Sequence, residues 1–187
     1  GKHTVTSNQL MSSTVFETLM SDVMNDEKRT VIVSPRWTIA DDEQWDEWAA
    51  VALGQKLVEK MFIVHHDQNH WVLLRVDLRH QEYCIEDTAV PQAVAEPIWE
   101  FWSKRLGKLG QSWRSTLQRC RRISVIPYKQ SPSQTICGSL VVMQILQGIV
   151  GNTIRANAKE LNDDELARLV GALWAVGQGH TRLGKPT

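Results

Sequence analysis

Residues 126–146 read IPYKQSPSQTICGSLVVMQIL, a polar loop that passes directly into an almost wholly apolar segment. A segment that is apolar all round predicts a buried helix, which we place from Cys137 to Val150. Cys137 then stands at the helix N-terminus, where unpaired N–H groups and the helix dipole favour a thiolate. Gly138 beside it leaves room for a substrate backbone to approach. Cys137 is therefore a candidate nucleophile, the alternative being an inert buried cysteine.

A predicted hairpin lies earlier in the chain, with strands at 71–77 and 82–86 and a polar turn at 78–81. His70 enters the first strand and Asp87 leaves the second. We expect the two residues to be equidistant from the turn and to face each other across the hairpin. A carboxylate beside an imidazole fixes the ring tautomer and stabilises the imidazolium, as nucleophilic catalysis requires. The alternative is a solvated histidine and a solvated aspartate at the hairpin ends.

The polar loop before Cys137 supplies two amide side chains, Gln130 and Gln134. In acyl transfer, a side-chain amide and the backbone N–H of the nucleophile can stabilise the oxyanion together, and one such donor is worth roughly 3 kcal/mol. Gln134 is only three positions before the cysteine, which is too close for an obvious reach. We therefore predict that Gln130 is the oxyanion donor.

The rest of the chain alternates short apolar runs, amphipathic stretches and polar turns. Helices are expected at 12–25, at 44–60, on either side of 107–110 within 91–120, and at 162–176; further strands are expected at 30–33, 61–65 and 123–126. The predicted class is α+β, with a small central mixed or antiparallel sheet flanked by helices. Because there is no internal repeat and no linker, residues 1–187 are predicted to form one domain.

Composition and charge narrow the classes of function. The formal net charge is zero, and no apolar run approaches the roughly 20 residues of a membrane span, so neither nucleic acid nor a membrane is indicated. The 3 cysteines are odd in number and include no CxxC pair. This pattern is typical of a reduced, intracellular protein of the nucleus or cytoplasm. The 8 tryptophans are expected in the core, with some lining a groove.

Two other clusters have simpler explanations than a functional site. His65, His66, Asp67 and His70 could be drawn as a metal site. However, this stretch is predicted to be strand and turn, whereas a zinc pair at i, i+4 needs a helix, so no metal is expected. The basic region 99–122, with several tryptophans nearby, could bind nucleic acid. A solvated helix face above core tryptophans is the better explanation.

Together these segments resemble the Ulp/SENP proteases, which cleave SUMO-type modifiers. The resemblance lies in MFIVHHDQNHWVLLRVDL (61–78), in YCIEDT (83–88) and in the loop that leads to the Cys-Gly pair. The order of these segments agrees with the family, as do the intervals of 17 and 50 residues between the candidate histidine, aspartate and cysteine. The resemblance implies an adenain-like cysteine protease fold, with the nucleophile at the start of a buried helix. It also implies roles for six residues: His70, Asp87 and Cys137 as the catalytic triad, Gln130 as the oxyanion donor, and Trp71 and Gly138 beside the substrate tail.

The chain departs from the family pattern at three places. Ile136 stands where the family usually has an aspartate before the cysteine. The loop from Gln130 to the cysteine is one residue longer than in the SUMO-specific members. Leu10 and Met11 occupy the region where SUMO proteases usually carry a tryptophan over the di-glycine tunnel. These departures leave the triad intact and bear on which modifier is cleaved.

The resemblance implies a thiol isopeptidase or processing peptidase that needs no cofactor. SUMO is the expected modifier, and a ubiquitin- or Nedd-type modifier is the alternative. The expected partners are a ubiquitin-like protein and its conjugates, and we expect a monomer that binds neither membrane nor nucleic acid. Two interpretations of other classes stay open: an acetyltransferase of the same fold that uses coenzyme A, and a non-catalytic modifier-binding module. Gly1 and the loose C-terminal end favour an excised catalytic domain.

Overall fold

The computed structural model describes residues 12–24, 29–54, 57–67, 70–87, 95–124, 137–149 and 168. Over these residues, helices and strands are interspersed along the chain. Their order is α2 (Ser13–Met24), β1 (Thr30–Val33), α3 (Arg36–Ile39), α4 (Asp42–Ala52), β2 (Lys60–Asp67), β3 (His70–Asp77), β4 (Glu82–Glu86), α5 (Ala95–Gly107), α6 (Gln111–Arg119), β5 (Arg121–Arg122) and α7 (Cys137–Ile149).

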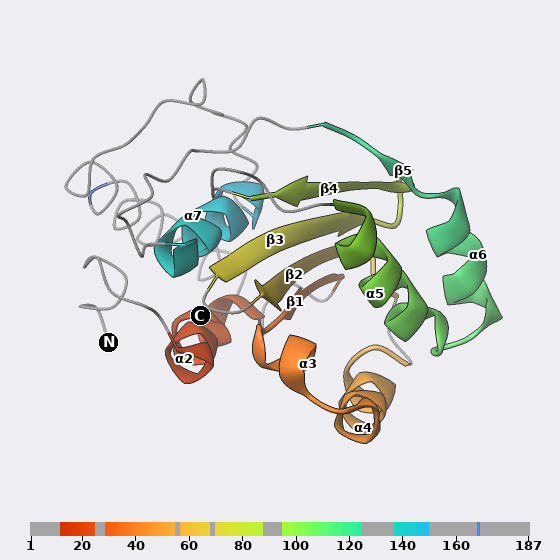
Figure 1. Ribbon diagram of the computed structural model, residues 1–187, viewed down its shortest axis with the longest axis horizontal. Helices are drawn as coiled ribbons and strands as arrows, with labels where there is room; N and C mark the ends of the chain where they lie inside the picture. The colour runs from red at the N-terminus through yellow and green to blue at the C-terminus, as the bar shows by residue number, and fades with distance from the viewer. Residues whose placement is uncertain are drawn as a thin grey trace, which may run out of the picture.

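The strands form one sheet of five strands in the order β1-β2-β3-β4-β5. The central strands β2, β3 and β4 are antiparallel neighbours, whereas β1 is parallel to β2 and β5 is parallel to β4. The sheet is therefore mixed, and the predicted α+β class with helices around a small sheet is confirmed (Figure 1).

Helices cover both faces of the sheet, and this explains why its central strands are apolar almost throughout. Trp71 and Leu73 of β3 pack with α2 and α7 in one apolar cluster. Val72 and Leu74 of the same strand pack with α4, α5 and α6 in the other. In Figure 1, α2 and α7 lie together toward one side, and α4, α5 and α6 lie toward the other. The alternation of side chains along β3 thus separates the two halves of the core.

Helix α4 begins two residues earlier and ends eight residues earlier than the predicted range of 44–60. Asp41 is its N-cap, and the Asp41 carboxylate accepts a hydrogen bond from the backbone N–H of Gln44 at 2.8 Å. The helix ends at Ala52, so the predicted continuation to Lys60, which instead begins β2, is wrong. At Gly54, a Cβ atom would lie 2.5 Å from the carbonyl oxygen of Ala50. A glycine just beyond the last helical turn is a common stop signal, and it outweighs the apolar periodicity here.

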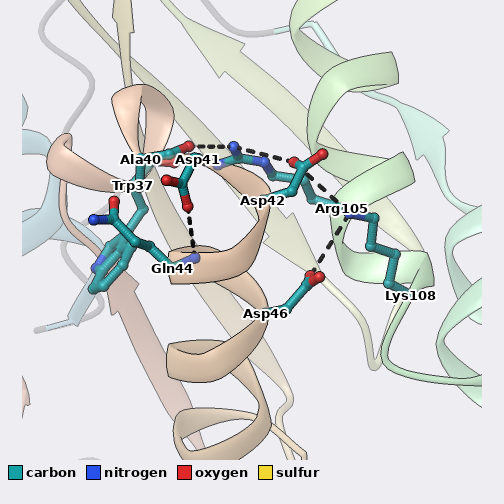
Figure 2. Close-up of polar contacts among 8 residues, drawn as sticks. All are labelled: Trp37, Ala40, Asp41, Asp42, Gln44, Asp46, Arg105 and Lys108. Atoms are coloured by element: carbon teal, nitrogen blue, oxygen red, sulfur yellow. Dashed lines mark hydrogen bonds and ion pairs between the residues drawn. The ribbon is translucent and has the colours of Figure 1, made fainter.

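Arg105 of α5 joins the segment of α3 and α4 to the rest of the molecule (Figure 2). Its guanidinium donates hydrogen bonds to the carbonyl oxygens of Trp37 and Ala40 and lies 3.7 Å from the carboxylate of Asp42. The residue is only 7% exposed. Its guanidinium carbon lies between 4.6 and 5.8 Å from the centres of three aromatic rings: Trp45, Phe101 and Trp102. Part of the tryptophan content is thus explained by a buried cation enclosed in aromatic rings.

The remaining predicted elements have mixed outcomes. The first helix, the strand at 30–33 and the two helices around 107–110 are confirmed. The short helix α3 was not predicted. A strand was expected at 123–126. The structure instead has the two-residue strand β5 at Arg121–Arg122, and residues 125–126 lie outside the described part. The helix expected at 162–176 also lies outside it, except for Arg168.

Among the described residues, no helix is both long and apolar enough to cross a membrane.

Candidate active site

The side chains of His70 and Asp87 meet at the open end of the hairpin formed by β3 and β4. His70 is the first residue of β3, and Asp87 directly follows β4. Nε2 of His70 lies 2.5 Å from Oδ1 of Asp87. The carboxylate is buried, at 3% exposure, whereas the imidazole retains 25%. A buried carboxylate in contact with a partly accessible imidazole is the orienting pair that nucleophilic catalysis uses.

The two residues do not face each other in the way the sequence predicted. Asp77 pairs with Glu82, and Leu73 pairs with Glu86. Continued by one residue, this register sets Asp87 opposite Val72, so the predicted equidistance of His70 and Asp87 from the turn is wrong by two positions. The observed register is centred between Arg79 and His80, in the middle of the predicted turn at 78–81, whereas equidistance of His70 and Asp87 requires a centre between Leu78 and Arg79. The side chains still meet because diagonal neighbours on one face lie within reach of aromatic rings.

The strand on the other side of β3 also helps to orient His70. His70 pairs with Asp67 at the end of β2. The hydroxyl of Thr38 accepts a hydrogen bond from the backbone N–H of His66 at 3.0 Å and donates one to the carbonyl oxygen of Val64 at 3.4 Å. The end of β2 is therefore attached to α3, and the start of β3 is paired with the end of β2.

The contact at Nε2 determines the roles of the two ring nitrogens of His70. An ionised carboxylate next to Nε2 favours the tautomer that carries its proton there. In that tautomer, Nδ1 bears the lone pair and can accept a proton. The assignment is the reverse of the serine-protease arrangement, in which the carboxylate contacts Nδ1.

Cys137 is the first residue of α7, as the sequence predicted for a nucleophile at a helix start. Gly138 follows it and is buried. The helix contains six fully buried apolar residues between positions 140 and 146, and it packs on the face of β3 that carries Trp71 and Leu73. The side chain of Cys137 and all of Gln130 lie outside the described part of the structure. Their predicted roles therefore stay predictions.

Trp71 is more buried than a freely accessible groove wall would be, with 6% exposure. Its ring meets the ring of Phe16 edge-on, with 5.6 Å between the centroids. Phe16 belongs to α2, which is attached to the sheet next to β1. There, the carboxylate of Glu17 accepts a hydrogen bond from the Ser34 hydroxyl at 2.7 Å and pairs with Arg36 at 2.8 Å. The position of the Trp71 ring is thus set by α2 on one side and the sheet on the other.

His65, near the end of β2, has a hydrogen-bond partner that accounts for its position without a metal. Nδ1 of His65 accepts a hydrogen bond from the indole N–H of Trp102 at 3.0 Å. Burial lowers the pKa of His65 below its ordinary value, against the opposing effect of Asp67. Within the described residues, no three His, Cys, Asp or Glu side chains gather as a metal site would require.

The two other cysteines lie in settings that do not activate a thiol. Cys84 is buried in β4, at 3% exposure. The thiol of Cys120 donates to the carbonyl oxygen of Thr116 at 3.4 Å. Burial, together with the negative charge of Asp77, raises the pKa of Cys120 to about 11.

One group of polar residues near the site was not predicted from the sequence. Arg75 and Glu86 form an ion pair on the face of the sheet beneath α7, and Arg75 also reaches the backbone of Gln144. Arg75 and Glu86 interrupt apolar strands, which is a signal that sequence reasoning could have used. The contact to Gln144 spans 69 positions and has no sequence signature.

No family model and no curated protein matches the chain. Known structures do match it. The SUMO protease Ulp1 with its catalytic cysteine oxidised to a sulfinic acid matches at a TM-score of 0.72 and 15% identity, over 96% of this chain and 82% of that one. The C-terminal Ulp1 protease domain in complex with Smt3, the yeast ortholog of SUMO, matches at 0.66 and 15% identity, over 94% and 81%. The Ulp1-like SUMO protease catalytic domain of Chaetomium thermophilum matches at 0.63 and 12% identity, over 94% and 74%.

At sequence identities of 12–15%, the similarity to these structures shows that the fold is shared and no more. The chain has the fold of the Ulp1-like SUMO proteases, as its resemblance to the Ulp/SENP proteases predicted.

Proposed function

We propose that this chain is a thiol protease that cleaves after the Gly-Gly tail of a ubiquitin-like modifier. The observation that carries the proposal is the contact of His70 Nε2 with the buried Asp87 carboxylate at 2.5 Å. It occurs in a chain of the Ulp1-like fold in which Cys137 begins a buried helix.

The proposed reaction is acyl transfer to a thiolate. Nδ1 of His70 takes the proton of the Cys137 thiol, and Asp87 stabilises the resulting imidazolium through Nε2. The thiolate attacks the carbonyl carbon of the terminal glycine, and the oxyanion is stabilised by the amide of Gln130 and the backbone N–H of Cys137. When the intermediate collapses, the imidazolium gives its proton to the leaving amine. Water, deprotonated by the same imidazole, then hydrolyses the thioester and restores the thiol.

SUMO is the modifier that we propose first. One structure of the same fold is a complex with Smt3, the yeast ortholog of SUMO, which supports a modifier of this class. Trp71, next to His70 in β3, is the residue that we expect to border the tail. Its ring is buried and meets the ring of Phe16 edge-on, which restricts its motion. A ring held in this way would exclude residues larger than glycine from the tail. The 3 cysteines, odd in number and without a CxxC pair, support a reducing compartment, the nucleus or the cytoplasm.

A panel of activity probes tests the proposal. SUMO, ubiquitin and a Nedd-type modifier, each ending in a Gly-Gly electrophile, are incubated with the protein and with Cys137→Ser. We expect a covalent adduct with the SUMO probe, no adduct in the variant, and cleavage of the matching fluorogenic substrate. A strong preference for ubiquitin would change the modifier and keep the mechanism. If none of the three probes reacts and none of the substrates is cleaved, the proposed function is wrong.

A further inference from the structure

Arg75 occupies the middle of β3 and makes three contacts on the face of the sheet beneath α7. Its Nη2 donates a hydrogen bond to the carbonyl oxygen of Gln144 at 2.9 Å. Its Nε lies 3.5 Å from Oε2 of Glu86, which is an ion pair without hydrogen-bond geometry. Its guanidinium carbon lies 5.6 Å from the centre of the Phe62 ring. One side chain thus connects β2, β4 and the helix that begins at Cys137.

The ion pair lies in a largely dehydrated part of the molecule. The side chain of Glu86 is 6% exposed, and that of Arg75 is 23% exposed. A buried carboxylate is costly without a cationic partner, so the charge of Arg75 contributes to the stability of β4 at this point. Glu86 is also the residue directly before Asp87, so its position and that of the candidate triad carboxylate are linked through the backbone.

The approach of α7 to Arg75 depends on a glycine in the second half of the helix. A Cβ atom at Gly148 would lie 2.7 Å from two ring carbons of Phe62 and 3.4 Å from Nη2 of Arg75. Real side chains do not tolerate the first of these distances, so only glycine lets the helix lie this close to the sheet. The helix therefore rests against the Phe62 ring and the Arg75 guanidinium, with no side chain between them.

We propose that Arg75 is a positioning residue, which fixes where α7, and with it Cys137, lies relative to β4 and Asp87. The proposal rests on the proposed function of the triad. Gln144 lies seven residues after Cys137 on the same helix, about two turns, and Glu86 is one residue before Asp87. Because helices and paired strands are rigid over such lengths, a shift at Arg75 is transmitted to the nucleophile and to the His70–Asp87 pair.

The competing explanation is that Arg75 only neutralises Glu86. Removal of one partner of a buried ion pair is strongly destabilising, whereas removal of both charges is often tolerated. Two variants separate these explanations. Arg75→Met removes the Arg75 cation and keeps the Glu86 charge, whereas Arg75→Met combined with Glu86→Gln removes both charges of the pair. Arg79→Met is the matched control, since Arg79 is an exposed arginine on the turn that follows β3.

The measurements are melting temperature, kcat and KM on a SUMO-Gly-Gly fluorogenic substrate, and the rate of iodoacetamide alkylation of Cys137 against pH. We expect Arg75→Met to melt at a clearly lower temperature. The double variant should melt close to the unmodified protein and still lose about tenfold or more in kcat, with little change in KM. Its alkylation midpoint should move up toward about 8.5, the ordinary thiol value, because the thiolate loses its alignment with the imidazolium. Arg79→Met should change none of these.

A double variant with the original kcat and the original alkylation profile would show that Arg75 is only a counter-ion, and the proposal would be overturned. If the double variant does not fold, the kcat of Arg75→Lys provides the test. A single ammonium keeps the charge but cannot contact both Glu86 and Gln144, so kcat should still fall. An unchanged kcat in that variant also overturns the proposal. The alkylation profile needs no substrate. A reactive Cys137 without cleavage of any substrate therefore contradicts the proposed function alone, whereas an ordinary thiol in the unmodified protein contradicts both.

Discussion

The carboxylate of Asp87 contacts Nε2 of His70 at 2.5 Å, although the strand register sets Val72 rather than His70 opposite Asp87. The pair is therefore a diagonal one, made at the open end of the hairpin by a side chain that reaches along the strand. The contact at Nε2 leaves the role of base to Nδ1 in the proposed reaction. The Asp87 carboxylate and the pairing of β3 with β2 thus both contribute to the orientation of the ring.

Asp87→Asn should abolish most of the activity with little change in stability. The amide has the shape of the carboxylate, but it neither stabilises the imidazolium nor enforces the tautomer with its proton on Nε2. The equivalent change in the serine-protease template costs about 10⁴ in kcat, and we expect a loss of about 10²–10⁴ here. Substrate kinetics and a thermal melt measure the two effects.

Asp77→Asn is the control for this change. Asp77 lies at the other end of β3, where its carboxylate accepts hydrogen bonds from the backbone N–H of His80 at 3.0 Å and contacts the His80 ring at 2.9 Å. We expect a kcat within about twofold of the unmodified value. A catalytic requirement for Asp77 combined with a dispensable Asp87 would contradict the proposed triad.

The three cysteines should differ strongly in reactivity toward iodoacetamide. With its pKa raised to about 11, Cys120 is deprotonated to only roughly one part in 10³–10⁴ at pH 7.5. We expect Cys137 to be alkylated first, well ahead of Cys120 and the buried Cys84. Labelling of Cys120 should grow about tenfold per pH unit up to about pH 11. Peptide mapping by mass spectrometry at several pH values measures this order, and faster labelling of either other cysteine would contradict the nucleophile assignment.

Arg105→Met should lower the free energy of unfolding by about 2–4 kcal/mol. The change leaves the carbonyl oxygens of Trp37 and Ala40 without their charged donor in a partly buried position (Figure 2). Lys108→Met is the matched control, because Lys108 makes only exposed ion pairs, at 3.7 and 3.6 Å, with Asp42 and Asp46. Those pairs are worth less than about 1 kcal/mol. Urea unfolding of both variants measures the two free energies of unfolding. Equal losses of stability in the two variants would contradict the role given to Arg105.

Gly148→Ala should destabilise the protein by about 1–3 kcal/mol, despite the better helix propensity of alanine. The added methyl would lie 2.7 Å from the Phe62 ring, so α7 or the ring must shift. Gly107→Ala is the control at the end of α5. There, the nearest atom to an added methyl is Cγ of the Arg114 side chain, at 3.1 Å, which belongs to an exposed residue rather than to the core. We expect that variant to be neutral or slightly stabilised, as judged by the same unfolding measurement.

Local patterns predicted most of the fold and part of the candidate site. The apolar segment after Cys137 predicted α7, and the alternation around the turn at 78–81 predicted β3 and β4. The end of α4 was missed because a single glycine, Gly54, outweighed the periodicity. The diagonal contact of His70 with Asp87 was not foreseen, because the two residues were assumed to be equidistant from the turn, whereas the pairing of Asp77 with Glu82 sets Val72 opposite Asp87.

The interactions that join segments far apart in the sequence could not be predicted from local patterns. Arg75 donates a hydrogen bond to Gln144, 69 residues away in the sequence, and Arg105 donates one to Trp37, 68 residues away. Such contacts depend on how helices pack on the sheet, which no short window of sequence contains. An arginine within an apolar strand still indicates that a partner must lie nearby.

The stability of the protein should fall as the pH is lowered below about 6.5, in part through His65 at the end of β2. Burial lowers the pKa of His65 in the folded state, with Asp67 opposing and His66 adding to the effect, and protonation of Nδ1 removes the acceptor for the Trp102 indole. Because the folded pKa lies below the unfolded value of about 6.5, this contribution is fully present above pH 6.5 and is lost as the pH falls through the folded pKa. Melting temperatures between pH 8 and pH 5 measure the loss. His65→Gln keeps an acceptor that does not titrate, so it should flatten the profile, whereas His80→Gln on the exposed turn should leave it unchanged. An equally steep profile in His65→Gln would show that other groups cause the loss.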